Sequence, residues 1–158
     1  MTGPSKPRPE APLLFVASSG GHLVQLGMFA RSLDDDRVWV SFRTADAVSA
    51  LRAERVVWAY FPTNRSLVNL VKNTFLAFRV MRSIRPRVIV TTGAGVAVPF
   101  AYVGALFGVR TIYVESFARI TSPSLTGRLI HPIAYRFFVQ WPNLLSAFKK
   151  AEYRGTLV

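Results

Sequence analysis

The sequence lacks cysteine altogether and contains only two histidines, His22 and His131. The absence of cysteine excludes disulfide bonds, thiolate metal sites and cysteine nucleophiles. Two histidines are too few for a histidine-rich metal site, and we expect neither a metal nor a cofactor. The dinucleotide motif G-x-G-x-x-G and the phosphate-loop motif G-x-x-x-x-G-K-[ST] are both missing, which argues against an NTPase.

Acidic residues are scarce and unevenly placed. The formal net charge is +12, and no carboxylate lies between Glu54 and Glu115. Such a charge balance favours an anionic partner, which is a nucleic acid, an anionic lipid surface or a phosphorylated substrate. The sequence has no signature of an RNA-recognition motif, KH domain, zinc finger or homeodomain. We therefore expect no nucleic acid, and a basic nucleic-acid-binding α/β domain is the alternative.

Short apolar runs alternate with helical stretches along the chain. Such an alternation is typical of βαβ units and predicts an α/β fold, a Rossmann-like parallel sheet flanked by helices. The expected strands are Leu13–Ala17, Val38–Phe42, Val56–Phe61, Val88–Thr91, Thr111–Val114, Phe137–Val139 and Thr156–Val158. The expected helices are Leu23–Leu33, Ala45–Ala53, Leu67–Ile84, Val96–Phe107 and Leu125–Ala134.

Residues 13–158 are expected to form one domain, preceded by a flexible tail over residues 1–12. The tail is polar and proline-rich and has no apolar core of a signal peptide, so we expect a cytoplasmic location. The run Val88–Val109 has no charge and is long enough to cross a bilayer. Its glycines and Pro99 favour a buried strand, a turn and a helix instead of a membrane-embedded segment.

A glycine loop follows the first expected strand. Ser18-Ser19-Gly20-Gly21-His22 lies between the apolar run Leu13–Ala17 and the helix that begins near Leu23. Such a loop leaves backbone N–H groups free at a helix N-terminus, which favours a phosphate or diphosphate. The alternative is that the glycines only let the helix approach the sheet closely.

A second glycine turn, Thr91-Thr92-Gly93-Ala94-Gly95, follows the fourth expected strand, and Glu115 ends the fifth. Ligands bind at the carboxyl ends of strands in open α/β sheets, so we expect both loops and Glu115 to face one crevice. Glu115 is the only carboxylate between Glu54 and Glu152. It could accept a proton or hydrogen-bond a sugar. The alternative is a structural ion pair with Arg119 or Arg128.

The stretch Asn64–Arg87 is amphipathic, with an apolar stripe formed by Leu67, Leu70, Val71, Thr74, Phe75, Phe78 and Met81. Apolar residues recur at i, i+3 and i+4, and the basic residues Lys72, Arg79 and Arg82 fall largely off that stripe. An ordinary core-facing helix with a solvated basic back would show the same pattern. A helix resting on an anionic membrane surface is the second interpretation. We expect both, with the apolar stripe partly buried and the basic flank touching lipid head groups.

Three motifs occur in an order that resembles a known family: Ser18-Ser19-Gly20-Gly21-His22, then Thr92–Pro99, then Tyr113–Ser116 with Leu125–Leu129. Together they resemble the acceptor-side, N-terminal half of GT-B glycosyltransferases related to MurG, and specifically PssD/CpsF-type bacterial polysaccharide proteins. These are similar to the membrane-recruiting subunit of the eukaryotic dolichol-linked N-acetylglucosamine transferase. Ser18 and Ser19 replace the opening of the MurG glycine motif, so phosphate contacts there are expected to differ.

The resemblance implies a split enzyme. This chain would supply the acceptor and membrane side, and a separate donor-binding subunit would hold the nucleotide-sugar, expected to be a UDP-sugar. The implied acceptor is a sugar on a polyprenyl diphosphate, used in exopolysaccharide, capsule or lipid-linked oligosaccharide synthesis at the cytoplasmic face of the membrane. A non-catalytic membrane scaffold for the partner enzyme is a further alternative. The resemblance implies Glu115 and His22 as catalytic residues and the following as substrate-binding residues: Ser19, Gly20, Gly21, Gly93, Gly95, Arg119, Ser122 and Arg128.

Overall fold

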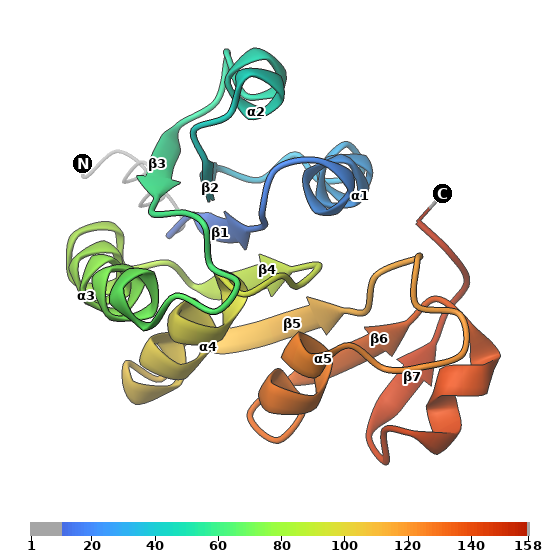
Figure 1. Cartoon of the computed structure of the whole chain (residues 1–158). Coiled ribbons are helices and arrows are strands. Elements are labelled where there is room, and N and C mark those ends of the chain that lie inside the picture. The colour runs from blue at the N-terminus through green and yellow to red at the C-terminus, as the bar shows by residue number, and fades with distance from the viewer. Residues whose placement is uncertain (1–10, 158) are drawn as a thin grey trace, which may run out of the picture.

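A computed structural model describes residues 11–157 of the chain. Seven strands form one sheet with the order β3-β2-β1-β4-β5-β6-β7, and every neighbouring pair is parallel (Figure 1). The strands are β1 Leu13–Val16, β2 Arg37–Phe42, β3 Val56–Ala59, β4 Val88–Thr91, β5 Arg110–Val114, β6 Arg136–Val139 and β7 Ala151–Tyr153. The helices are α1 Gly21–Ala30, α2 Ala45–Ala50, α3 Leu67–Ile84, α4 Ala97–Leu106, α5 Leu125–Ile130 and the short 3-10 helix η1 Pro142–Ser146.

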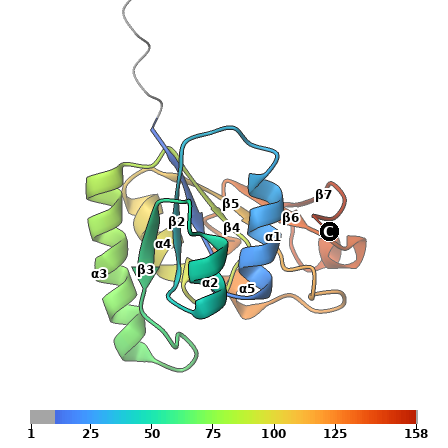
Figure 2. The ribbon, with the colours of Figure 1, turned by 90° about the horizontal axis from the view of Figure 1, so that it is seen from above.

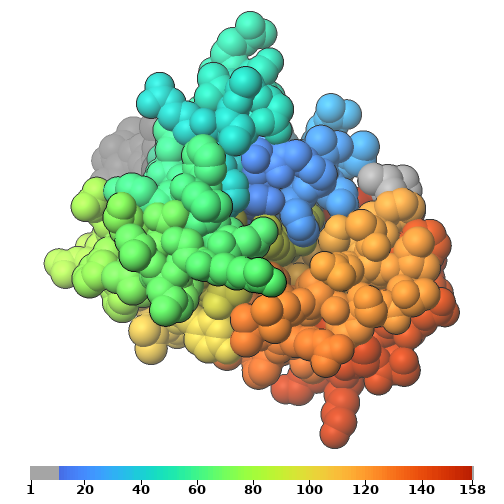
Figure 3. Space-filling model, viewed as in Figure 1, coloured from blue at the N-terminus to red at the C-terminus, as the bar shows by residue number. Residues whose placement is uncertain are grey.

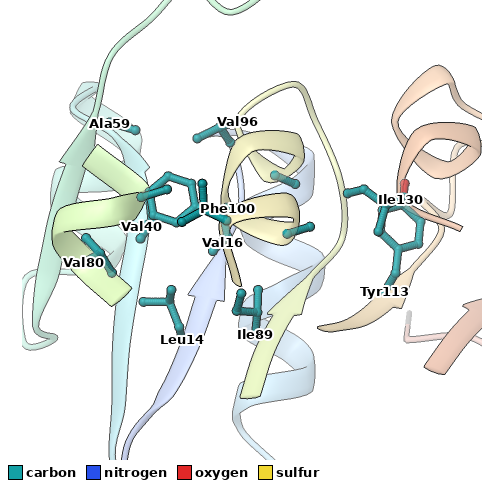
Figure 4. Close-up of a cluster of buried hydrophobic side chains, with 14 of the residues drawn as sticks. Leu14, Val16, Val40, Ala59, Val80, Ile89, Val96, Phe100, Tyr113 and Ile130 are labelled. Carbon is teal, nitrogen blue, oxygen red and sulfur yellow. The ribbon is translucent and has the colours of Figure 1, made fainter. Parts of the chain in front are cut away.

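The helices cover both faces of the sheet. In Figure 1, α1 and α2 lie on one side and α3, α4 and α5 on the other, and Figure 2 shows the same layers from above. Each face has its own apolar core. Figure 4 shows the larger core, where Leu14, Ile89 and Phe100 meet between the sheet and the helices. All four residues of β1 are buried, because a parallel strand between two helical layers has no solvent face.

The direction of the strand order reverses between β1 and β4. These two strands are neighbours, with Leu13 opposite Val88 and Val16 opposite Thr91. The chain leaves β1 toward β2 on one side and leaves β4 toward β5 on the other. The loops after the two strands therefore diverge at the carboxyl edge of the sheet, the usual ligand position in such folds.

The expected α/β architecture is confirmed, with one correction. The last strand was wrongly placed at Thr156–Val158: β7 is Ala151–Tyr153, directly after η1, which the sequence pattern did not indicate. Val88–Val109 forms β4, a glycine turn, α4 and the start of the following loop, as the glycines and Pro99 suggested. In the part of the chain that the structure describes, no helix is both long and apolar enough to span a bilayer.

The boundary of the proposed tail falls partly outside the described residues, since residues 1–10 are not among them. Pro12 belongs to the folded part of the chain, because its carbonyl oxygen accepts a hydrogen bond of 3.1 Å from the backbone N–H of Arg87.

The buried side-chain amide of Asn73 joins helix α3 to the end of strand β3. Ser66 caps its N-terminus by accepting from the backbone N–H of Asn69. The Asn73 side chain is fully buried and pairs with both backbone groups of Tyr60, at 2.9 Å each, just after β3. The residues of α3 that face the core are Asn73, Ala77, Val80 and Met81. The apolar stripe is therefore buried only in part, as expected: Met81 faces the core, whereas Leu67 and Phe75 are exposed.

Replacing Asn73 with Ala leaves the N–H and the carbonyl oxygen of Tyr60 without their partner. We expect the free energy of unfolding to fall by about 1–3 kcal/mol, as for other partly buried polar groups left unpaired. Urea denaturation measures the change. Asn143→Ala, at an exposed asparagine, is the matched control and should change stability by less than about 0.5 kcal/mol. Equal effects of the two substitutions would show that the Asn73 amide does not hold α3.

Candidate functional site

The candidate site lies where β1, β4 and β5 end. His22 is in the first turn of α1, Thr92 and Gly93 follow β4, and Glu115 follows β5. In the space-filling view, the surface is hollowed between the green segment before α3 and the orange segment around α5 (Figure 3). The reversal of strand order thus brings together residues from three separate parts of the chain, as the sequence predicted for the two glycine loops.

His22 is anchored to the turn after β4. Its Nδ1 lies 2.8 Å from the carbonyl oxygen of Thr92, and the Thr92 hydroxyl donates to the carbonyl oxygen of His22 at 2.9 Å. Because a carbonyl oxygen can only accept, Nδ1 carries the hydrogen and Nε2 of the neutral ring is left as an acceptor. Burial lowers the pKa of His22 below 6.5, and the hydrogen bond to Thr92 and the charge of Glu115 oppose that shift in part. The ring is therefore neutral at pH 7 and able to take a proton at Nε2.

Gly93 separates His22 from Tyr113. Its φ of 105° lies in the region that favours glycine. A Cβ atom at this position would lie 2.8 Å from the Tyr113 hydroxyl and 3.5 Å from Cε1 of His22. At Gly95, a Cβ atom would lie 2.9 Å from the hydroxyl oxygen of Thr63, in the loop between β3 and α3. Close packing thus requires both glycines, and Gly93 lies beside His22.

Glu115 is fully buried and surrounded by donors. Its Oε1 accepts from the backbone N–H of Ser116 at 3.0 Å and from the Tyr113 hydroxyl at 3.2 Å. Its Oε2 accepts from the backbone N–H of Ser124 at 3.0 Å and from the Ser124 hydroxyl at 2.9 Å. Ser124 in turn caps α5 by accepting from the backbone N–H of Gly127. These contacts make Glu115 the residue that holds the start of α5 against β5.

The first glycine loop already contacts an anion within the protein. The backbone N–H of Gly20 donates to a carboxylate oxygen of Asp46, at the start of α2, over 3.0 Å. The nearby Thr44 hydroxyl and this Gly20 amide lower the pKa of the exposed Asp46 carboxyl. The space around Gly20 and Gly21 is open, and Ser19 beside them is half-buried. Asp46 was not among the predicted site residues, because its contact with Gly20 spans two βα units and has no local signal in the sequence.

The other predicted site residues lie farther out. Arg119 is exposed in the loop after β5, and its charge contributes to the lowered pKa of His22, which places it near that ring. Ser122 and Arg128 are exposed on the same loop and on α5. Within residues 11–157, no ion pair joins Glu115 to Arg119 or Arg128, and no group of three or more His, Asp or Glu side chains could hold a metal ion.

A second surface, formed by α3 and α4, is both apolar and basic. Leu67, Phe75 and Leu106 are 78%, 71% and 76% exposed. The predicted membrane residues Lys72, Arg79 and Arg82 are exposed on α3. The ammonium group of Lys72 lies 5.4 Å from the ring centre of Tyr60. We call this region the α3–α4 face.

Comparisons with known proteins agree on one family. The profile of the family described as "Oligosaccharide biosynthesis protein Alg14 like" matches residues 31–157. The UDP-N-acetylglucosamine transferase subunit ALG14 of Candida albicans is 30% identical over 94% of this chain and 79% of its own length. The protein of the same name from Debaryomyces hansenii is 33% identical over 81% of this chain and 57% of its own length.

Solved structures share the fold. MurG from Acinetobacter baumannii superposes with a TM-score of 0.75 at 17% identity, over 92% of this chain and 45% of that one. UDP-GlcNAc 2-epimerase from Methanocaldococcus jannaschii superposes with a TM-score of 0.68 at 16% identity, again over 92% and 45%. This chain therefore has the Rossmann-type fold of a GT-B half and spans less than half of these larger proteins.

The contacts of Glu115 lead to a stability prediction. A glutamine at this position would turn one acceptor oxygen into an amide donor that faces the donors of Ser116 or Ser124. We expect Glu115→Gln to lower the free energy of unfolding by about 1–3 kcal/mol. Glu152→Gln, which affects the exposed ion pairs with Arg136 and Arg154, should lower stability by less than Glu115→Gln does. Urea denaturation of both variants gives the comparison. A smaller loss of unfolding free energy in Glu115→Gln than in Glu152→Gln would contradict the role of Glu115 in holding α5 against β5.

Proposed function

The chain belongs to the Alg14 family, and from that premise we propose that it is the acceptor-side subunit of a GT-B glycosyltransferase. A separate subunit binds the donor nucleotide-sugar, which the names of the relatives suggest is UDP-N-acetylglucosamine. The acceptor is a sugar on a polyprenyl diphosphate. The word "subunit" in those names supports a catalytic partner. The narrower assignment to PssD/CpsF-type proteins of bacterial polysaccharide synthesis stays a prediction.

The observation that carries the proposal is the neutral His22 in the crevice where the strand order reverses. In sugar transfer, a hydroxyl oxygen of the acceptor attacks the anomeric carbon of the donor. The bond from that carbon to the nucleotide diphosphate breaks, and its electron pair leaves with the diphosphate. The hydroxyl proton must go to a base, and Nε2 of His22 has the required tautomer and lowered pKa. We therefore assign proton transfer to His22.

Glu115 acts as a positioning residue in this proposal. Both its oxygens are occupied by Tyr113, Ser116 and Ser124, and its side chain has no exposed surface. The Glu115 carboxylate could contact the acceptor only if these hydrogen bonds broke. By holding the start of α5, Glu115 shapes the loop that carries Arg119 and Ser122. These two exposed residues and Arg128 are left free to contact the sugar or the diphosphate.

The first glycine loop suits the diphosphate of the acceptor. The Gly20 amide holds a carboxylate oxygen of Asp46, so this amide points to a position that an anionic oxygen occupies. The open space around Gly20 and Gly21 allows a larger group to approach. In the turn after β4, Gly93 lies against the His22 ring. The diphosphate would thus lie between two glycine turns, with the reacting sugar toward His22.

The α3–α4 face is proposed to rest on an anionic membrane, at its cytoplasmic side. Exposed Leu67 and Phe75 would enter the interface, and Lys72, Arg79 and Arg82 would contact lipid phosphates. Among residues 11–157, no ion pair neutralises these three cations. Helix α3 begins after the loop that packs on Gly95, so its N-terminal end is near the crevice. A polyprenyl-linked acceptor could then reach the site from the membrane.

The assay that tests this function combines the chain with its donor-binding subunit, UDP-N-acetylglucosamine and a polyprenyl-diphosphate sugar. We expect transfer only when both subunits are present. His22→Ala should lower kcat by roughly 10²–10⁴-fold, the usual contribution of a general base. Since burial holds the pKa of His22 below 6.5, the wild-type rate should fall only as the pH drops through values below 6.5.

His131→Ala is the control, because this second histidine packs against Phe137 and Phe148, away from the crevice. It should leave kcat within about twofold. If His22→Ala keeps the wild-type rate in an active complex, His22 is not the base and the subunit only presents the acceptor to its partner.

Membrane binding through the α3–α4 face gives a separate prediction. Each basic residue near an anionic surface contributes about 1 kcal/mol, so reversing Lys72 and Arg79 to Glu should weaken partition by at least roughly 30-fold. Co-sedimentation with vesicles that contain anionic lipid measures this partition. High salt should also weaken the binding of the wild-type protein to these vesicles. Reversal of Arg31 and Arg52, which are exposed in the α1–α2 layer, changes the net charge equally. Equal losses for both pairs would show that total charge, and not this face, governs binding.

A further inference from the structure

Two buried glutamines join distant parts of the chain beside the candidate site. The side-chain oxygen of Gln25 accepts from the backbone N–H of Phe117 and from the side-chain nitrogen of Gln140, at 2.9 Å each. That nitrogen also donates to the carbonyl oxygen of Glu115 at 3.0 Å. The side-chain oxygen of Gln140 accepts from the backbone N–H of Leu157 at 2.7 Å. Gln25 is 9% exposed and Gln140 is 1% exposed.

We propose that Gln140 is a positioning residue that couples the segment Arg154–Leu157 to the geometry of the transfer site. The proposal rests on the function proposed above and adds a means of regulating that site. It assigns no chemical step to Gln140, which acts through α1 and through the loop after β5.

The first link runs from Gln140 to His22. Gln25 lies three residues after His22, one turn farther along α1, so the two side chains belong to the same rigid helix. A second hydrogen bond, from Gln25 to the hydroxyl of Ser116 at 3.4 Å, joins that helix to the loop after β5. The position of Gln25 therefore fixes the start of α1, and with it His22, relative to this loop.

The second link runs from Gln140 to the loop that carries Glu115 and Arg119. Gln140 holds the backbone of Glu115, and its neighbour Trp141 donates from its indole nitrogen to the carbonyl oxygen of Phe117 at 2.7 Å. The rings of Phe117 and Trp141 are also in contact. Two successive residues after β6, Gln140 and Trp141, thus hold the loop by hydrogen bonds.

The third link is the segment Arg154–Leu157. It leaves β7 and runs toward α1 without joining the sheet (Figure 1). Among the described residues, the Leu157 amide is the only partner of the Gln140 side-chain oxygen. If the segment moves away, this buried oxygen loses its donor, and such a loss is costly unless the amide reorients. Reorientation of Gln140 would weaken its bonds to Gln25 and Glu115. A displacement of Leu157 would therefore shift both α1, which carries His22, and the loop after β5.

Leu157→Pro tests the coupling, because proline removes the backbone N–H. Leu157→Ala keeps the N–H and is the matched control. Hydrogen exchange at the Phe117 amide should become roughly tenfold faster in Leu157→Pro and stay unchanged in Leu157→Ala. In the two-subunit complex, kcat should fall roughly five- to tenfold in the proline variant at saturating donor and acceptor, while the KM of the donor is unchanged.

A double-variant cycle separates coupling from general disruption. Gln140→Met removes the hydrogen bonds at similar size, so Leu157→Pro should have no further effect on exchange or kcat in that background. Additive effects in the cycle, or unchanged Phe117 exchange in Leu157→Pro, would overturn the inference. Exchange is measured on this chain without substrates. A complex that lacks transfer activity but shows the exchange pattern would therefore refute the proposed function and leave the coupling intact.

Discussion

The parallel pairing of β1 with β4 is the constraint on which the site depends. Because these strands are neighbours although α1, α2 and α3 lie between them in the chain, the loops after them start side by side and then diverge. Their common starting point allows the Thr92 carbonyl to reach His22 and fix its tautomer. It also requires glycine at position 93, where no side chain fits between His22 and Tyr113. A change in the order of these two strands would separate every element of the proposed crevice.

Most of the fold could be predicted from the sequence, because local patterns indicate its strands and turns. Buried parallel strands appear as short apolar runs, and glycines mark the turns after β1 and β4. The strand at Thr156–Val158 was wrong because a short apolar stretch near the end of a chain resembles an edge strand, whereas Ala151–Tyr153 carries Glu152 and has a weak pattern. Helix α3 was placed correctly, but how much of its apolar stripe is exposed could not be predicted, since periodicity shows that a stripe exists without showing what covers it.

The site was predicted only in part. His22, Gly93, Gly95 and Glu115 do meet at one edge of the sheet, since strand ends can be inferred from the pattern. The partners of Glu115 could not be inferred, because burial and hydrogen bonding depend on the loop that folds back to Ser124. Gln25 and Gln140 gave no signal at all. They are far apart in the sequence, and a glutamine has the same local pattern whether it is solvated or buried.

The contact between Gly20 and Asp46 has a consequence for how any anion would bind at the first glycine loop. Asp46 belongs to α2, so its carboxylate is held close to the Gly20 amide by the fold itself and acts at a high effective concentration. An incoming anionic group must displace this internal ligand and cannot simply occupy an empty position. Binding at the loop is then an exchange of one anion for another, and its equilibrium is set by the difference between two similar interactions. Weak, readily reversible binding of an anion follows from such an exchange.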